Sequence, residues 1–570
     1  MLLAALLMTF ISCAPHTNDP STDAVTSDTE TSSALTDVDP QRKLTLYDGA
    51  DNLFRIVTAS APTDVEKAFA EELAGEIKST LGKKPETVTD KHSDGSYACE
   101  VVVGYTALAE SDAAFSSITY GQACVRVEGN RILVAAFSDD GYNELFLHFS
   151  RLIFNNKRNN ALVLTVSQLE YTLSLDPYLI NVPSADGVGL PTIVDCGIKQ
   201  TLFLYENASK EAYDRYVSKI GAELAVSESS IKESRFSTFD IGAGILNVSF
   251  TSSDNALRII YEHSTRPSEL LTPEEGTVSV CEPLLIMRGM SWKDENNETK
   301  KNGLCIVIRA SNGKFIIIDG GWDRQRDADD LYNILAEYTP SGTTPTVAAW
   351  VLTHAHEDHQ SVFAFDFPNT YTGRVNVENV IFNPPASGFY IGSNVSGHVS
   401  NEKEIFNATS KLGAKLIRPH VGDKYYVGDA VIEINYTIDL HYPEKFDYYN
   451  TCSLMMTICI AGQRIMITGD ASNVSFGMAA DIFGNELKCD IVQVAHHGYG
   501  TGVDANKSTN IIRGYTFMSP SLLLWPSSDS GYQSGIQSAY NIALVRLPTV
   551  KKILVAGDYD HVVSLPYKSQ

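Results

Sequence analysis

Residues 354–359 read His-Ala-His-Glu-Asp-His, and only Thr353 separates them from the apolar run Ala-Ala-Trp-Val-Leu at 348–352. A short apolar run of this kind predicts a buried strand, so three imidazoles and the carboxylate of Asp358 come together in the loop at its end. Imidazole and carboxylate groups suit zinc, and iron or manganese also accept them. The stretch therefore predicts a metal site at the mouth of a buried strand.

Three more predicted strands, all after residue 278, end in side chains of the same kind. They deliver Asp319, Asp470 and the pair His496 and His497, which follow strand-like runs at 315–318, 464–467 and 490–494, respectively. Nine of the 13 histidines lie at or after residue 354. Strands followed by polar loops that end in ligands are what a layered α/β metallohydrolase requires.

Four such strand ends in this order resemble the metallo-β-lactamase superfamily, over about residues 278–570, with the His-x-His-x-Asp-His pattern carrying the resemblance. Within it, residues 440–443 (Leu-His-Tyr-Pro), 450–454 (Asn-Thr-Cys-Ser-Leu) and 495–498 (Ala-His-His-Gly) are similar to the hydrolase-like domain of the ComEC/Rec2 DNA-uptake proteins. The resemblance implies an α/β fold, in which a C-terminal αββα sandwich is preceded by two smaller α/β or α+β domains.

The resemblance also implies two metal ions, expected to be zinc with iron or manganese as alternatives, and a set of seven ligands. The expected ligands are His354 and His356 for the first metal, Asp358, His359 and His496 for the second, Asp470 as a bridge, and His441 as the third ligand of the first metal. Asp358 is also expected to hold the metal-activated water that serves as nucleophile. No serine or cysteine nucleophile is needed, and the chain has no Gly-x-Ser-x-Gly elbow and no Walker A loop.

Four further side chains belong to this prediction without being assigned to a metal. His398 and His420 are the other candidates for the third ligand of the first metal, although His441 better suits the order of strands. His497 is expected to lie behind His496. Asp319 is expected to hydrogen-bond the loop that carries the ligands rather than to bind metal.

The chain before residue 278 carries no catalytic constellation. A capping box at 63–66 opens an amphipathic helix that stops at Gly82, and strands are predicted at 100–104 and 131–136, so residues 44–175 are expected to form an accessory α/β domain. Residues 190–277 are expected to form a second, mixed α+β domain. The layout of the first resembles accessory domains of carbohydrate-active enzymes, which leaves a carbohydrate contact open beside a spacer or interaction role.

The N-terminus predicts export. Residues 2–11 are apolar apart from Thr9 and are followed by Ser12 and Cys13, which resembles a bacterial signal peptide (1–13) whose lipobox cysteine is lipidated. The run is too short to span a bilayer. Residues 14–43, rich in Ser, Thr and Asp, are expected to be a linker. The expected protein is lipid-anchored through Cys13 to the outer face of the bacterial cytoplasmic membrane, or secreted.

Charge and cysteine spacing exclude two classes of site. The net charge of −25 opposes broad, nonspecific nucleic-acid binding. None of the cysteines forms a CxxC pair, which excludes a cysteine zinc ribbon and leaves disulfide pairing open.

The function expected from these features is an exported metal-dependent hydrolase, with a phosphodiester as its substrate because of the resemblance to the DNA-uptake group. The chain has no apolar run of 18 residues, so it is not expected to transport DNA itself. One alternative is a surface-anchored glycan- or partner-binding protein with a metal-binding but non-catalytic domain. Another is a hydrolase of a cyclic amide or ester that uses the same site.

Overall fold

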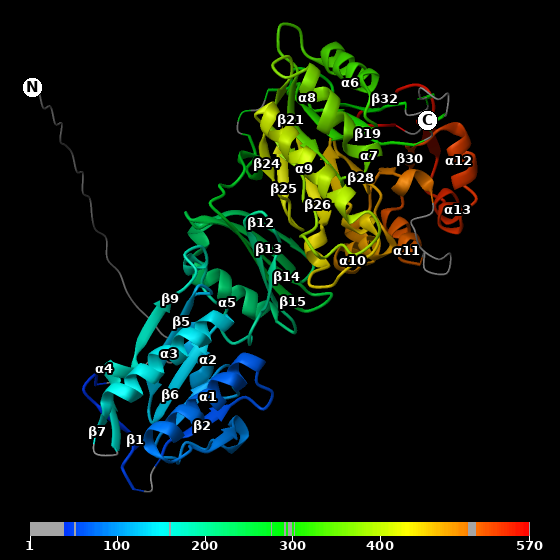
Figure 1. Ribbon diagram of the computed structural model, residues 1–570. Coiled ribbons are helices and arrows are strands. Elements are labelled where there is room, and N and C mark those ends of the chain that lie inside the picture. The colour runs from blue at the N-terminus through cyan, green and yellow to red at the C-terminus, as the bar shows by residue number, and fades with distance from the viewer. Residues whose placement is uncertain are drawn as a thin grey trace, which may run out of the picture.

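Three sheet-based bodies follow one another along the chain in the computed structural model (Figure 1). The structure describes residues 39–568 except 51–52, 159–160, 275, 277, 290–291, 294–298, 301 and 500–508. The expected signal peptide and all but the last residues of the expected linker lie outside the described residues. In the described part of the chain, no helix has the length and apolar character needed to cross a membrane.

The N-terminal body is built on a six-stranded mixed sheet with helices α1 (Asp64–Leu81) and α3 (Asp139–Asn156) on one face and α2 (Ala109–Ser116) on the other. The predicted capping box of α1 is confirmed, because Thr63 and Glu66 bond reciprocally, and Gly82 ends the helix in a left-handed conformation. The sheet order is β3 (Thr87–Thr89), β2 (Arg55–Thr58), β4 (Glu100–Val103), β6 (Arg131–Ala136), β5 (Gln122–Glu128) and β9 (Tyr171–Ser174). A small sheet of β1 (Lys43–Tyr47), β8 (Ala161–Thr165) and β7 (Lys157–Arg158) lies beside it.

The middle body is a six-stranded antiparallel sheet with one covering helix, α5 (Lys210–Ile220). Its order is β10 (Thr192–Asp195), β11 (Gln200–Tyr205), β15 (Ala256–His263), β14 (Gly244–Thr251), β13 (Ser234–Asp240) and β12 (Ala225–Ile231). Alternate side chains of β11 point to opposite faces. Phe203 and Tyr205 pack under α5, whereas Leu202 and Leu204 join the core of the C-terminal body. The middle body is therefore packed against the C-terminal body.

The C-terminal body contains two sheets packed face to face. The first has the order β24 (Lys415–Ile417), β23 (Asn379–Ile381), β21 (Thr346–Val351), β20 (Phe315–Asp319), β19 (Cys305–Arg309), β16 (Leu284–Met287) and β32 (His561–Ser564), with β22 (Asn376–Val377) beside β21. The second has the order β25 (Lys424–Val427), β26 (Ala430–Tyr436), β27 (Met455–Ile460), β28 (Gln463–Ile467), β29 (Ile491–Gln493), β30 (Leu522–Trp525) and β31 (Lys552–Val555).

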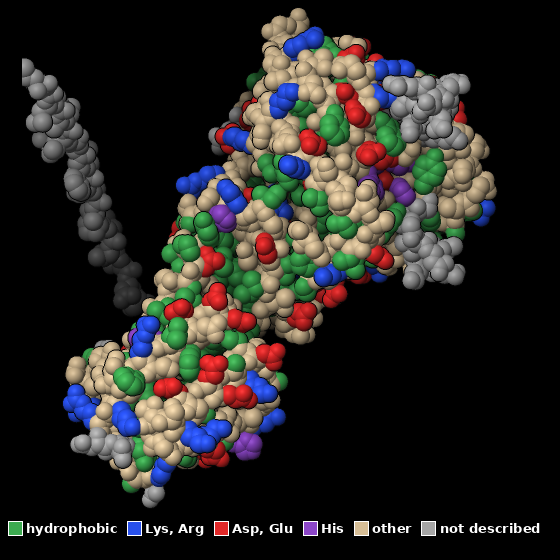
Figure 2. Space-filling view, in the orientation of Figure 1, with side chains coloured by type: hydrophobic (Ala, Val, Ile, Leu, Met, Phe, Trp, Pro, Cys, Tyr) green, Lys and Arg blue, Asp and Glu red, His purple; other side chains and the backbone are tan. Residues whose placement is uncertain are grey.

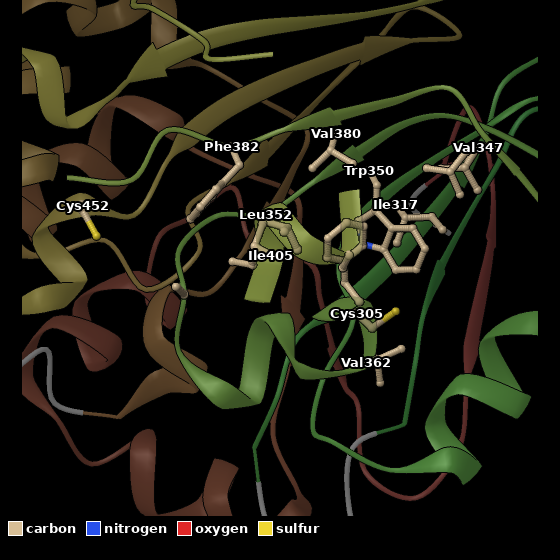
Figure 3. Packing of buried hydrophobic residues seen from close by; sticks show 14 of the residues in the cluster. Cys305, Ile317, Val347, Trp350, Leu352, Val362, Val380, Phe382, Ile405 and Cys452 are labelled. Carbon is tan, nitrogen blue, oxygen red and sulfur yellow. The ribbon is translucent and has the colours of Figure 1, made fainter. Parts of the chain in front are cut away.

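Helices cover the outer face of each sheet, which gives four layers. Helices α6 (Gln325–Tyr338) and α9 (Val395–Leu412) cover the first sheet, and α10 (Asn473–Phe483), α11 (Thr509–Met518) and α13 (Ala539–Val545) cover the second. The side chains of β20 show why both faces are buried. Ile316 and Ile318 point between the sheets, whereas Phe315 and Ile317 point to the helices, where Ile317 lies beside Trp350 and Val362 (Figure 3). The predicted αββα sandwich is confirmed by this layering.

Two parallel strand pairs decide where the site lies. Strands β20 and β21 run parallel in the first sheet, and β28 and β29 run parallel in the second. The carboxyl ends of parallel strands meet at one edge of a sheet, and polar residues gather there. A backbone hydrogen bond from Leu454 to Thr353 joins the two edges. The eight cysteines among the described residues are all free thiols.

Candidate metal centre

The four ligand-bearing loops meet at one edge of the sandwich. The loop after β21 carries His354 and His356 and then enters the short helix α7 (Glu357–Ser361), which holds Asp358 and His359. The loop after β28 carries Asp470, and the turn Ala495–Gly498 after β29 carries His496 and His497. On the face shown in Figure 2, histidine and acidic side chains reach the surface together on the C-terminal body. The structure therefore brings together residues spread over more than 140 positions of sequence, 354 to 497.

Asp319, at the end of β20, anchors the loop that carries the histidines. Its Oδ1 accepts a hydrogen bond from the backbone N–H of Thr353 (2.7 Å), and its Oδ2 accepts one from the Thr353 hydroxyl (2.8 Å). The same Oδ2 lies 2.7 Å from Nδ1 of His359. Asp319 is fully buried, and among the described residues its side chain bonds Thr353 and His359.

One half of the cluster contains Asp358, His359 and His497, whose ligand atoms all lie within 4.8 Å of one another. His359 Nε2 is 3.1 Å from His497 Nε2, and His497 Nε2 is 3.1 Å from Asp358 Oδ2. Asn302 donates a hydrogen bond to the same Asp358 oxygen at 2.5 Å. Both imidazoles are fully buried.

The other half is centred on His354, whose ligand atom lies within 4.8 Å of those of Asp470 and His359, and it also includes His356 and His496. His354 Nε2 lies 2.9 Å from His356 Nδ1, and it lies 3.9 Å from Oδ2 of Asp470. His496 Nε2 is 3.7 Å from the same oxygen. With 23% of its side chain exposed, His496 borders solvent, whereas His354 is fully buried.

Asp470 lies between the two halves. Its Oδ1 is 3.2 Å from His359 Nε2 and 3.5 Å from His497 Nε2, while Oδ2 faces His354 and His496. Burial would raise the pKa of Asp470, but the surrounding imidazoles outweigh it and hold the pKa well below its usual range. A carboxylate whose two oxygens face separate nitrogen sets has the geometry of a bridging ligand.

The donor set fits a divalent cation. Nδ1 of His497 lies 2.9 Å from the carbonyl oxygen of Pro526, which can only accept, and 3.4 Å from the backbone N–H of Gly303. The shorter contact places the proton on Nδ1. The carboxylate of Asp319 fixes the proton of His359 on Nδ1 in the same way. When both rings are neutral, the Nε2 atoms of His359 and His497 each present a lone pair. These two atoms are 3.1 Å apart and lie next to the carboxylates of Asp358 and Asp470. Two lone pairs this close repel one another unless a proton or a metal cation lies between them.

Carboxylates dominate the electrostatics at His359. Burial would lower the pKa of this imidazole, but Asp470, Asp319 and Asp358 outweigh it and hold the pKa well above its usual range. In the other half, burial and the neighbouring imidazoles of His359 and His356 hold the pKa of His354 well below its usual range. The negative potential at the His359 ring favours a bound cation.

The structure shows where three of the expected histidines lie. His497, expected behind His496, faces Asp358 and His359, whereas His496 faces the oxygen shared with His354. Both residues are left-handed, with φ of 50° and 53°, so the side chains do not follow the alternation of the preceding strand. His441 follows β26, and its ring lies edge-on to that of Phe446, with 5.6 Å between ring centroids. Both of its ring nitrogens are buried without a hydrogen-bond partner among the described residues, so its place as a ligand stays a prediction.

Two other histidines were open candidates for the first metal. His420 is paired with Asp439 at 2.7 Å, away from the cluster. His398, on α9, lies beside the cluster, because its ring centroid is 5.0 Å from that of His356. The His398 ring is stacked on Tyr449, with 3.9 Å between centroids. Sequence reasoning missed Asn302 and the Pro526 carbonyl, because an amide and a backbone oxygen carry no spacing signal.

Solved structures similar to parts of this chain include the following three. One is the metallo-β-lactamase fold protein YhfI from Bacillus subtilis, at 13% identity over 49% of this chain and 99% of that one, with a TM-score of 0.32. Another is unliganded yeast PDE1, at 10% identity over 50% and 100%, with a TM-score of 0.32. The third is CmlA, a diiron β-hydroxylase from Streptomyces venezuelae, at 13% identity over 52% of this chain and 55% of that one, with a TM-score of 0.30.

No protein-family model matches the chain, and no curated protein is significantly similar to it. The four-layer arrangement and the ligand geometry rest on the chain's own strand pairing and contacts, not on these likenesses.

Proposed function

We propose that the protein is a metal-dependent hydrolase with a dinuclear centre, acting on a phosphodiester. The observation that carries the proposal is the position of Asp470, whose two oxygens face two separate sets of ligand atoms. Zinc suits these nitrogens and carboxylates, and iron or manganese remain alternatives. The choice of a phosphodiester rests on the resemblance of residues 440–443, 450–454 and 495–498 to the DNA-uptake group.

In this proposal, the cluster provides two adjacent metal sites. His354, His356 and His496 would hold the first ion, Asp358, His359 and His497 would hold the second, and Asp470 would contribute to both sites. Bound together, the two ions would lower the pKa of a water molecule and offset charge on the substrate oxygens. His496 borders solvent, so the substrate approaches from its side.

The chain's own residues orient the reaction. Asn302 holds one oxygen of Asp358, and the other oxygen is left to accept a hydrogen bond from the attacking water. The water oxygen forms a new bond to phosphorus as the ester P–O bond breaks, and its proton passes by way of Asp358 to the leaving alkoxide. Asp319 keeps His359 in the tautomer that directs Nε2 at the site.

Metal content and hydrolysis together test this function. We expect about two ions per chain by elemental analysis of protein lacking residues 1–40, and hydrolysis of bis(4-nitrophenyl) phosphate that disappears on chelation. His356→Ala and Asp358→Ala should each lower kcat by roughly 100-fold or more. Full activity in both variants would contradict the assignment. Absence of metal after reconstitution would favour the binding-protein alternative, and hydrolysis of a lactam but of no phosphodiester would favour the cyclic-amide alternative.

We also propose that the protein is exported and lipid-anchored through Cys13, on the basis of residues 2–13 alone. Cys13→Ala should release the protein from the membrane fraction and abolish incorporation of labelled palmitate. Equal membrane association of both proteins would contradict the anchor.

A further inference from the structure

A cavity of about 330 Å³ lies between helix α9 and a turn of the middle body. Val395, His398, Val399 and Glu402 line it from α9, and Cys196, Gly197 and Ile198 line it from the turn between β10 and β11. Residues 384–388 form a further wall. The cavity is therefore built jointly by the middle and C-terminal bodies.

The cavity adjoins the candidate metal centre. Two of its lining residues, His398 and Tyr390, have ring centroids 5.3 Å apart, and both contact the ring of Tyr449. His398 is also 5.0 Å from His356 between ring centroids. Its Nδ1 is buried and has no hydrogen-bond partner within the described part of the chain. Only the side chain of His398 therefore separates the cavity from His356, so a substrate bound at the metals could extend into the cavity.

The turn that closes the cavity is strained. Gly197, Ile198 and Lys199 have φ of 67°, 35° and 66°, which puts a β-branched residue in the left-handed region. Such a conformation costs of order 1–3 kcal/mol and persists only where the surroundings enforce it. The Ile198 side chain stays 49% exposed although it lines the cavity, so burial against the protein does not account for the strain.

Arg418 holds this turn in place. Its guanidinium donates to the carbonyl oxygens of Cys196 (3.2 Å) and Gly197 (3.0 Å) and to the side chain of Asn383 (3.2 Å). These hydrogen bonds occupy the guanidinium of Arg418, so it is not available to bind a group inside the cavity. The remaining walls are mostly proline, alanine, glycine, valine and aromatic side chains, with Ser387, His398, Glu402 and Lys403 as the polar ones. Such a lining favours a flat, uncharged, apolar group.

We infer that this cavity is the substrate-binding pocket of the metal centre, and that it takes a flat aromatic group on the part of the ester that is not the leaving group. This inference rests on the proposed hydrolase function. It gives the middle body a role in substrate selection, because Ile198 forms one wall of the pocket.

Two esters that share a leaving group test the pocket. Bis(4-nitrophenyl) phosphate carries a second ring, whereas methyl 4-nitrophenyl phosphate does not. Ile198→Gly removes one wall, and Val399→Trp fills the space from an exposed position on α9. Each should lower the ratio of kcat/KM for the first ester to that for the second by fivefold or more. An unchanged ratio in both variants would overturn the pocket.

The matched controls are Lys199→Gly, in the same left-handed turn, and Asn407→Trp, exposed on the same helix, neither of which lines the cavity. Both should leave the ratio unchanged within 1.5-fold. Ile198→Gly should hold or raise Tm, as Lys199→Gly should, because both relieve a left-handed residue. A ratio that falls equally in the controls would overturn the assignment of the wall to Ile198.

Calorimetric binding of 4-nitrophenyl phosphate separates the pocket from the proposed function. Its Kd should rise fivefold or more in Ile198→Gly and Val399→Trp and stay constant in the controls. If the unaltered protein hydrolyses neither ester but shows this binding pattern, the pocket stands and the hydrolase function falls. If it hydrolyses both esters and neither the ratio nor the Kd responds, the function stands and the pocket falls. Neither binding nor hydrolysis would overturn both.

Discussion

The carboxylate of Asp470 separates two histidines that are consecutive in sequence. His496 Nε2 is 3.7 Å from its Oδ2, and His497 Nε2 is 3.5 Å from its Oδ1. Removing either imidazole should therefore empty a different metal site. We expect about one ion per chain in His496→Ala and in His497→Ala, and two in the control His441→Ala, by elemental analysis. Two ions in His496→Ala with one in His441→Ala would instead place His441 in the first site.

Glu402 gives a prediction about pH. Burial raises its pKa to about 7, and the hydrogen bond from Tyr449 (2.6 Å) offsets only part of this effect. The folded state therefore holds this proton more tightly than the unfolded state, whose carboxyl has a pKa near 4.5. Stability from this group is fully present below about pH 4.5 and is lost as the pH rises to about 7.

Glu402→Gln removes that loss while keeping an acceptor for Tyr449. The difference in Tm between this variant and the unaltered protein should be larger at pH 8 than at pH 5. The change corresponds to about 2–3 kcal/mol of unfolding free energy. Thermal melts at the two pH values measure this difference. Glu404→Gln, on the same helix, is the control for loss of one negative charge. An equal Tm difference at both pH values would mean that Glu402 does not hold its proton in the fold.

At the scale of elements, the loop after β28 is pressed against the loop after β21. Gly469 has a φ of 52°, and a Cβ added there would lie 2.8 Å from Cβ of Thr353. Thr353 cannot give way easily, because Asp319 holds both its N–H and its hydroxyl. Gly469→Ala should therefore cost about 2–4 kcal/mol, from the left-handed backbone and the overlap together.

Gly462→Ala is the matched control for this prediction. Gly462 is also left-handed, with a φ of 73°, but an added Cβ would meet nothing within 4 Å. It should cost only about 1–2 kcal/mol. Urea denaturation of the two variants compares the costs, and equal midpoints would mean that contact with Thr353 adds nothing.

The elements differ in how well sequence predicted them. Strands β20 and β28 were predicted within a residue or two, because uninterrupted apolar runs ending in polar loops have few other interpretations. Helix α9 was not predicted, although it supplies His398 and Glu402, since only a few of its positions are buried. The left-handed conformations of His496 and His497 carry no sequence signal, so their order around Asp470 required the structure.

At the scale of the molecule, the acidic surface repels anions, whereas the candidate centre is proposed to bind an anionic phosphodiester. The chain carries a net charge of −25, which repels a phosphodiester at long range. Two divalent ions in the cluster would supply the local positive charge that the surface lacks. Selection by a pocket of apolar walls is consistent with this balance, because an uncharged ring enters without meeting the surface potential.

Arg418 links the middle body to the wall of the cavity beside the centre. This side chain is almost fully buried and bonds the carbonyls of Cys196 and Gly197. Arg418→Met keeps apolar bulk but leaves those buried carbonyls without their charged donor, which should cost roughly 3 kcal/mol or more. We expect faster hydrogen exchange in peptides covering β10 and β11, and a lower ratio of kcat/KM for the two nitrophenyl esters, as in Ile198→Gly.

Arg266→Met is the control, because Arg266 is 70% exposed and pairs with Asp240 at 3.2 Å, also within the middle body. Exposed ion pairs of this kind contribute only about 0–1 kcal/mol, so exchange and substrate ratio should match the unaltered protein. If Arg418→Met speeds exchange in β10 and β11 yet leaves the ratio unchanged, the middle body is held by Arg418 but takes no part in choosing the substrate. If hydrogen exchange and the substrate ratio both change, Arg418 both holds the middle body in position and enables that body to select the substrate.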